Sequence, residues 1–206
     1  MENIKTIGKT IYQMELENIE NAISVFDSDS YESIVKEVLE TTKNWWRIIM
    51  TWVGKNSFLA AKTAATMSSI WIPAFYLDTT WALHWDLWMI TKKDFVIHLS
   101  KSWNTDEMIN AAYNMKKLWY KQWAIICNEK WKVKDIVNIT LVVPFIKEAD
   151  FNWLAPSSSS TLLLMICDTI WLTVSKLIWF KKDDFFKFHP WGSLWKMLKE
   201  ELWKEI

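Results

Sequence analysis

Two loops rich in small polar residues are the parts of this sequence best suited to binding an anion. One runs from Thr51 to Ser57 (Thr-Trp-Val-Gly-Lys-Asn-Ser) and the other from Ser100 to Thr105 (Ser-Lys-Ser-Trp-Asn-Thr). Each follows an apolar run and precedes a segment with helical spacing, so hydroxyls and free backbone N–H groups would meet at a helix N-terminus. Taken alone, each loop is more often a simple helix cap. Together they predict phosphate-binding side chains at Ser57, Ser100, Ser102 and Thr105.

The elements that must position these loops alternate between strand and helix. Runs rich in β-branched residues predict strands at Arg47–Val53, Ala74–Leu77, Asp94–Leu99, Ala124–Cys127 and Ile139–Phe145. Helical spacing predicts helices at Ser57–Ile70, Thr105–Leu118, Ser158–Ile178 and Leu194–Glu205. This alternation predicts an α/β protein, a three-layer αβα sandwich around a five-stranded parallel sheet. Right-handed crossovers then bring the carboxyl ends of the strands to one edge, where such sheets bind ligands.

Residues 1–44 are more polar and are predicted to form two helices that precede the sheet. Tyr12, Leu16, Ile19 and Ile23 recur at spacings of three or four, and the segment Asp27–Ser30 supplies caps for a second helix. We therefore expect helices over residues 1–44 that pack on a single domain spanning residues 45–206.

Composition and charge narrow the protein classes. The chain has 24 Lys and Arg against 24 Asp and Glu, which gives no electrostatic reason to expect nucleic acid or a membrane surface as a partner. Cys127 and Cys167 lie in apolar runs, which predicts buried thiols. The N-terminus lacks a basic segment followed by an apolar one, and the run Leu162–Cys167 is too short to span a bilayer. We expect a cytoplasmic protein.

Five motifs, in order along the chain, resemble those of one family. The two loops are similar to the Thr-Gly-x-Gly-Lys-Ser and Ser-x-Ser-Gly-x-Thr signatures of sugar-isomerase (SIS) domains, with Asn56 inserted in the first. Three further segments resemble the arabinose 5-phosphate isomerase branch: Ala82–Ile90 (Ala-x-His-Gly-Asp-Leu-Gly-Met-Ile in the family), Trp153–Ser159 (Gly-Leu-Ala-Pro-Thr-Thr-Ser) and Phe188–Trp195 (with His-Pro-Gly-Gly-Ser-Leu-Gly). The chain ends at Ile206, so it is similar to the short members without regulatory CBS modules.

The resemblance implies a flavodoxin-like SIS fold and an activity. The family interconverts D-ribulose 5-phosphate and D-arabinose 5-phosphate through an enediol, a step in carbohydrate-derivative metabolism that feeds lipopolysaccharide biosynthesis. It implies a sugar phosphate as substrate, no cofactor and no required metal, and a homo-oligomer, either a dimer or a tetramer.

The resemblance also proposes five catalytic side chains. Glu148 would be the base that moves a proton between C1 and C2, and His84 and His189 would open the sugar ring or move protons between oxygens. Lys55 would hold phosphate or polarise an oxyanion, and Glu107 would orient Lys55 or bind a hydroxyl. By position alone, each has an ordinary structural interpretation, such as a solvated loop carboxylate or an exposed lysine. The third histidine, at position 98, lies inside a predicted strand and is interpreted as core.

Tryptophan and glycine are present in unusual numbers, 17 and 3 respectively. Tryptophan stands where the family has glycine at positions 52, 85, 88, 103, 153, 191 and 195, and Trp71, Trp119 and Trp179 fall where turns commonly require glycine. We hypothesise that a codon meaning glycine in the source organism, UGA, has been decoded as tryptophan; the alternative is a protein genuinely rich in tryptophan. The coding DNA decides between them. A chain made with these tryptophans is expected to have little activity.

Two other functions remain open. The chain would also suit an isomerase of another sugar phosphate. A non-catalytic sugar-phosphate sensor is a second alternative, but such sensors carry a DNA-binding helix-turn-helix, and residues 1–44 have an acidic excess.

Overall fold

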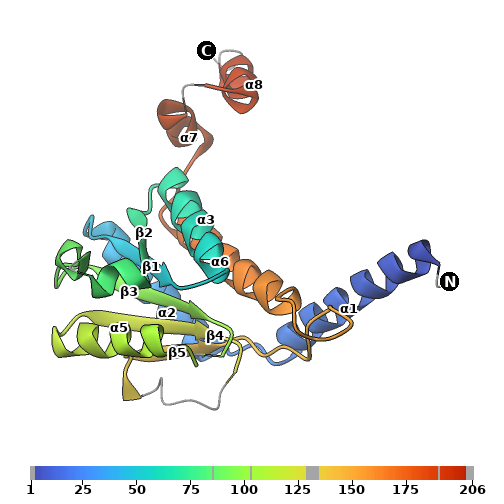
Figure 1. The fold of residues 1–206 in the computed structure, drawn as a ribbon. Helices are drawn as coiled ribbons and strands as arrows, with labels where there is room; N and C mark the ends of the chain where they lie inside the picture. The colour runs from blue at the N-terminus through green and yellow to red at the C-terminus, as the bar shows by residue number, and fades with distance from the viewer. Residues whose placement is uncertain (1–2, 85, 103, 129–134, 190, 203–206) are drawn as a thin grey trace.

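The fold is built on one parallel sheet of five strands (Figure 1). The computed structural model describes residues 3–84, 86–102, 104–128, 135–189 and 191–202. The strands are β1 (Ile48–Trp52), β2 (Ala74–Asp78), β3 (Phe95–Ser100), β4 (Lys121–Ile126) and β5 (Ile139–Val142), in the spatial order β2-β1-β3-β4-β5. Every neighbouring pair is parallel. The predicted sheet is confirmed, and the strand bounds differ from the predicted ones only at the ends.

Both faces of the sheet are covered, because alternate side chains of each strand point to opposite layers. Ile48 and Met50 pack in the larger core cluster with α2 (Ser28–Lys43), α3 (Asn56–Ser69) and α6 (Ser158–Leu177). Ile49 packs on the other face, in a cluster that includes residues of α4 (Thr79–Leu83) and α5 (Asp106–Lys117). The predicted three-layer αβα sandwich is therefore confirmed.

Helix α6 is the central helix of the layer that also contains α2 and α3. Of the described helices, it is the one long and apolar enough to cross a membrane by length and composition. Its apolar side is used within the protein, since side chains such as Leu163, Ile170 and Trp171 are fully buried in the core cluster.

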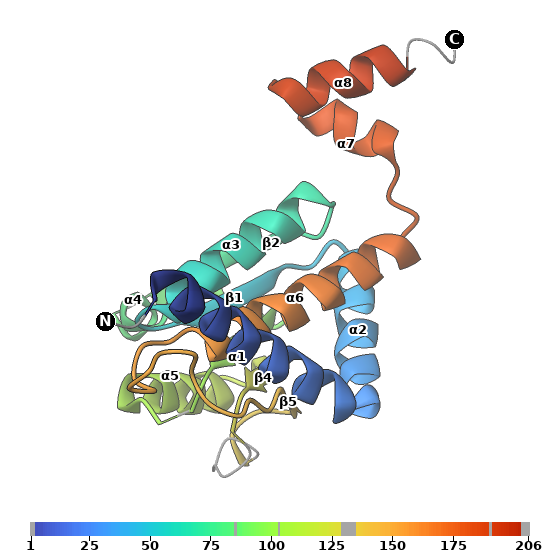
Figure 2. The same cartoon turned by 90° about the vertical axis from the view of Figure 1, so that its right-hand side faces the viewer.

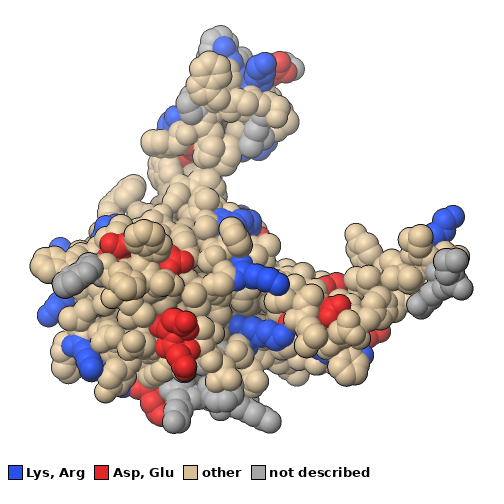
Figure 3. Space-filling model, in the orientation of Figure 1, with Lys and Arg blue, Asp and Glu red and all other residues tan. Residues whose placement is uncertain are grey.

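The ends of the chain extend away from the sheet. The first half of α1 (Ile4–Ser24) projects into solvent, whereas its second half lies along α6 (Figures 1 and 2). The pair α7 (Lys182–Phe188) and α8 (Ser193–Leu202) stands apart beyond the end of α6 (Figure 2). Three short elements were not predicted, namely α4, the 3-10 helix η1 (Asp86–Met89) and α7. In the view of Figure 3, basic and acidic side chains form small groups of both signs, as a neutral charge balance implies.

Candidate active site

The carboxyl ends of the strands lie together at one edge of the sheet. The register pairs Trp52 with Asp78 and Ser100 with Ile126, the last residues of four strands. Beyond the strands, the Cys127 backbone N–H donates to the Ser100 carbonyl at 3.1 Å. The loop after β3, predicted to bind phosphate, is thereby fixed to the end of β4.

Glu148 lies at this edge, in the loop between β5 and α6, and only 1% of its surface is exposed. One carboxylate oxygen accepts hydrogen bonds from the backbone N–H groups of Ser157 (2.9 Å) and Ser159 (3.1 Å). The other accepts from the Ser159 hydroxyl and lies 2.6 Å from the Lys101 ammonium. The carboxylate therefore joins the loop after β3 to the start of α6.

The same loop is held from its other side by α1. Asn18 is buried, its side-chain amide donates to the Lys147 carbonyl at 3.1 Å, and its side-chain oxygen accepts from the Ile146 N–H at 2.7 Å. These bonds immediately precede Glu148 in the chain. A buried polar residue of α1 thus fixes the position of the predicted base.

The surroundings of Glu148 keep it ionised. Burial alone would raise the pKa of this carboxyl, but the ion pair with Lys101 and the hydrogen bonds from Ser159 and Ser157 outweigh burial and lower the pKa to about 2. At neutral pH the group is a buried carboxylate that can accept a proton.

This pKa makes acid stability a test of the site. In the unfolded chain Glu148 has a pKa near 4.5, so the folded state binds fewer protons between pH 4.5 and about 2. The stabilisation is complete above pH 4.5 and is lost as the pH falls towards 2; its size is about 3 kcal/mol. Urea unfolding at a series of pH values should show this loss, and Glu148→Gln should flatten it. An equal pH dependence in the variant would contradict the assignment.

The loop after β1 carries two further predicted residues to the same edge. Lys55 is exposed at the N-cap of α3, and Ser57, in the first turn, donates its N–H to the Gly54 carbonyl at 2.9 Å. Beside them, the Tyr76 hydroxyl donates to the Asp78 carboxylate at 2.9 Å. Among the described residues, no ion pair joins Lys55 to Glu148, whose ion-pair partner is Lys101.

The loop after β3 carries the remaining predicted phosphate residues. Ser100 is buried at the end of the strand, Ser102 is half-buried, and Thr105 is the N-cap of α5 without a side-chain capping bond. Glu107 is exposed in the first turn of α5. The loop leads into the N-terminus of α5, where backbone N–H groups favour an anion.

The two predicted catalytic histidines are not brought together in the single chain. His84 lies at the C-cap of α4, which follows β2 at the carboxyl edge. His189 ends α7 and stacks on Phe185 with ring centroids 3.8 Å apart. Phe188 packs against Trp71, which precedes β2, so α7 lies towards the amino edge, opposite Glu148.

The third histidine belongs to the core. His98 is fully buried in β3, 2.9 Å from the Gln122 side-chain oxygen. Burial lowers its pKa to about 4, so the imidazole is neutral at physiological pH. The interpretation of this residue as core is confirmed.

Lys101 and Asn18 are residues of this site that the sequence analysis did not single out, and only Lys101 had a signal in the sequence. That signal was the position of Lys101 between Ser100 and Ser102, two predicted phosphate residues. Among the described residues, no cluster of three or more His, Cys, Asp and Glu side chains could hold a metal ion.

The tryptophans at family glycine positions occupy different environments. Trp52 is buried in the larger core cluster, whereas Trp88 and Trp191 are largely exposed. Trp195 stacks on Phe186. The tryptophans at positions 85 and 103 lie outside the described residues.

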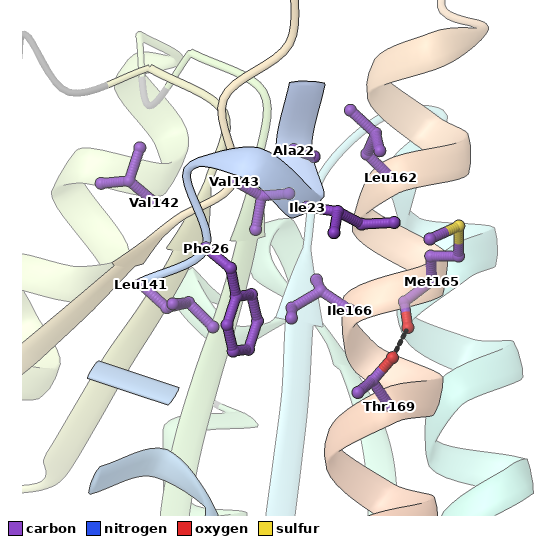
Figure 4. A pocket seen from close by; sticks show the side chains of 10 residues that line it. All are labelled: Ala22, Ile23, Phe26, Leu141, Val142, Val143, Leu162, Met165, Ile166 and Thr169. Carbon is purple, nitrogen blue, oxygen red and sulfur yellow. Dashed lines mark hydrogen bonds between the residues drawn. The ribbon is translucent and has the colours of Figure 1, made fainter. Parts of the chain in front are cut away.

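An apolar pocket of about 390 Å³ lies elsewhere, between the end of α1, β5 and α6 (Figure 4). Its walls include Phe26, Leu141 and Ile166, and the Thr169 hydroxyl in its wall donates to the Met165 carbonyl of the same helix at 2.8 Å. With no ionisable group in its lining, this pocket does not suit a sugar phosphate.

Comparison with known proteins gives the family of the chain. No protein-family model matches it. It is 33% identical over 187 residues to the arabinose 5-phosphate isomerase KdsD of Francisella tularensis, covering 91% of this chain and 57% of that one. It is 28% identical over 195 residues to an Escherichia coli arabinose 5-phosphate isomerase KpsF, covering 95% of this chain and 60% of the relative. The chain thus spans somewhat more than half the length of these relatives.

A solved structure matches over its full length. The E. coli CFT073 protein c3406, in complex with arabinose 5-phosphate, superposes with a TM-score of 0.84 and 31% identity, over 92% of this chain and 100% of that one. The chain belongs to the arabinose 5-phosphate isomerase family of SIS proteins. In this member of the SIS family, the Lys101–Glu148 pair joins the loops after β3 and β5.

Proposed function

We propose that the protein is an aldose–ketose isomerase that interconverts D-ribulose 5-phosphate and D-arabinose 5-phosphate. The observation that carries the proposal is the ionised, buried Glu148, held at the carboxyl edge against the predicted phosphate loop. The 31% identity to a protein with arabinose 5-phosphate bound supports the choice of substrate.

The chemistry is a proton transfer within the sugar. Starting from the ketose, the Glu148 carboxylate takes a proton from C1, and the electrons form the C1–C2 double bond of an enediol. The proton returned to C2 gives the aldose, while a hydroxyl proton moves between the two oxygens. No external oxidant or reductant enters. The helix N-termini behind Ser57 and Ser102 would anchor the phosphate. Lys55 would bind the phosphate, and Glu107 would bind a sugar hydroxyl. His84 would move protons between oxygens.

In this proposal, His189 acts in the active site of a second copy of the chain. Because α7 contacts its own domain at Trp71, on the edge opposite Glu148, we infer a homo-oligomer, a dimer or a tetramer, in which α7 of one chain reaches the site of another. The two free, buried thiols, Cys127 and Cys167, suit a reducing cytoplasm. We also propose that the product feeds lipopolysaccharide biosynthesis and that the protein has neither nucleic acid nor a membrane as a partner.

The test uses a glycine variant in which the seven tryptophans at family glycine positions are replaced: Trp52, Trp85, Trp88, Trp103, Trp153, Trp191 and Trp195. Incubated with D-ribulose 5-phosphate in D₂O, it is expected to form D-arabinose 5-phosphate with deuterium at C2, as NMR would detect. The unsubstituted chain is expected to give little product. Turnover of a hexulose phosphate alone would favour another isomerase, and binding without turnover would favour a sensor.

A further inference from the structure

The Lys101 ammonium contacts the β5–α6 loop at two points. It lies 2.6 Å from a Glu148 carboxylate oxygen and 5.2 Å from the centre of the Phe145 ring. Lys101 belongs to the loop after β3, and Glu148 and Phe145 to the loop after β5, so these contacts bridge across the end of β4. A lysine held both by a carboxylate and by an aromatic face has a fixed ammonium position.

The burial of the two partners is unequal. The Glu148 side chain is 1% exposed and that of Lys101 is 36% exposed. A carboxylate taken out of water takes up a proton unless hydrogen bonds and an opposite charge compensate for its lost hydration. The serine donors supply the hydrogen bonds, and Lys101 supplies the charge. A protonated Glu148 could not act as a base.

We propose that Lys101 is a positioning residue for the catalytic base: its ammonium keeps the buried Glu148 carboxylate charged and in one orientation at the carboxyl edge of the sheet. The inference rests on the proposed isomerase function, in which Glu148 removes the proton from the sugar. It assigns to Lys101 a role that acts through Glu148, and it needs no contact between Lys101 and the substrate.

The other ionisable groups around Glu148 do not supply this charge. Cys127, at the end of β4, is a buried thiol whose pKa is raised to about 12 by burial and by the Glu148 charge, so it is neutral. Lys147 is exposed to solvent, and the carboxylate of Asp150 accepts from two backbone N–H groups of its own loop. Among the described residues, the one ion-pair partner of Glu148 is Lys101.

The experiment compares three substitutions in the active glycine variant. Lys101→Met keeps the length of the side chain and removes its charge, and Lys101→Arg keeps the charge. Lys62→Met removes a lysine that pairs with Asp168 at 2.7 Å on the surface, away from this edge. For each, kcat/KM is measured from about pH 4 to about pH 8 and divided by the parent value at the same pH, which cancels the titration of substrate and histidines. The Glu148 carboxyl carbon is titrated in parallel by ¹³C NMR in the unsubstituted chain and in its Lys101→Met form.

Without Lys101, the pKa of Glu148 is expected to rise from about 2 to between about 3 and about 5, the usual effect of removing an adjacent opposite charge. The kcat/KM ratio of Lys101→Met should therefore fall further as the pH is lowered, whereas those of Lys101→Arg and Lys62→Met should stay constant. An unchanged NMR titration would overturn the proposal and indicate a merely structural lysine, as would a ratio that is reduced equally at every pH when the titration places the pKa at about 4 or above. A glycine variant that is inactive at every pH would instead refute the isomerase function, and with it the role of Lys101 in catalysis.

Discussion

Replacing Trp45, Trp71, Trp119, Trp153 and Trp179 by glycine is expected to stabilise the fold by about 5 kcal/mol in total, or about 1 kcal/mol each. These five are the non-glycine residues with positive φ among the described residues, with φ between 56° and 66°. The left-handed conformation costs a residue with a side chain about 1–2 kcal/mol, and glycine avoids that cost while losing somewhat more backbone entropy on folding.

Four of the five end helices in the manner that favours glycine. After α5, the Trp119 N–H donates to the Lys116 carbonyl at 3.0 Å and the next N–H, that of Tyr120, donates to the Met115 carbonyl at 3.1 Å. The same pair of hydrogen bonds ends α2 at Trp45 and α6 at Trp179. After α3, at Trp71, one bond of the pair is present, from the Ile72 N–H to the Met67 carbonyl. This is the Schellman termination, in which the left-handed residue is usually glycine.

Little packing is lost in exchange. Trp45, Trp119, Trp153 and Trp179 are between 60% and 83% exposed. Trp71 packs on the rings of Phe180 and Phe188, and within the described part of the chain it is the one of the five with such ring contacts. The fivefold variant should unfold at a higher urea concentration, with the melting temperature raised by about 2–4 °C for each kcal/mol.

The matched control is Trp81→Gly, an exposed tryptophan inside α4 without positive φ. Glycine there should cost about 1 kcal/mol of helix stability. If the fivefold variant also loses stability, the tryptophans belong to the native fold and the hypothesis of a misread glycine codon loses its structural support. If the fivefold variant is more stable than the parent, the hypothesis of a misread glycine codon expects UGA at those five codons.

The order of the elements could be predicted from the sequence because strand and helix have different periods. The short elements were missed because they are too short to show a period: α4 has 5 residues and η1 has 4, whereas a helical pattern repeats every 3.6 residues. The fourth strand was predicted to begin at Ala124 but begins at Lys121, because the polar Gln122 interrupts the apolar pattern. In the fold, Gln122 is buried two residues away in register from the partner of His98, and its side chain hydrogen-bonds to the His98 ring, which no local pattern can indicate.

The site could be predicted only as far as the strand ends. Ser100 and Glu148 were placed at one edge by topology, and both lie there. The ion pair that joins their loops through Lys101 depends on how two loops fold over β4, and a lysine between two serines gave no sign of its partner. Trp45 was missed as a turn residue because it belongs to no family motif; its left-handed φ follows from the way α2 ends.

Glu148→Gln in the glycine variant is expected to lower kcat/KM by about 10²–10⁴, the usual contribution of general base catalysis. Glutamine has nearly the same shape and can still accept from the Ser157 and Ser159 N–H groups, but it cannot take the sugar proton. The measurement is the rate of deuterium incorporation from solvent, which reports the proton transfer directly.

The control for this prediction is Asp94→Asn, since Asp94 is also a buried carboxylate in an ion pair. Its carboxylate lies 2.6 Å from the Arg47 guanidinium and is 2% exposed, and it immediately precedes β3, at the amino edge of the sheet. Asp94→Asn should therefore lower the free energy of unfolding and leave kcat/KM within a few-fold of the parent. Equal losses of activity in the two variants would mean that Glu148 acts through stability alone, and another group would then have to be the base.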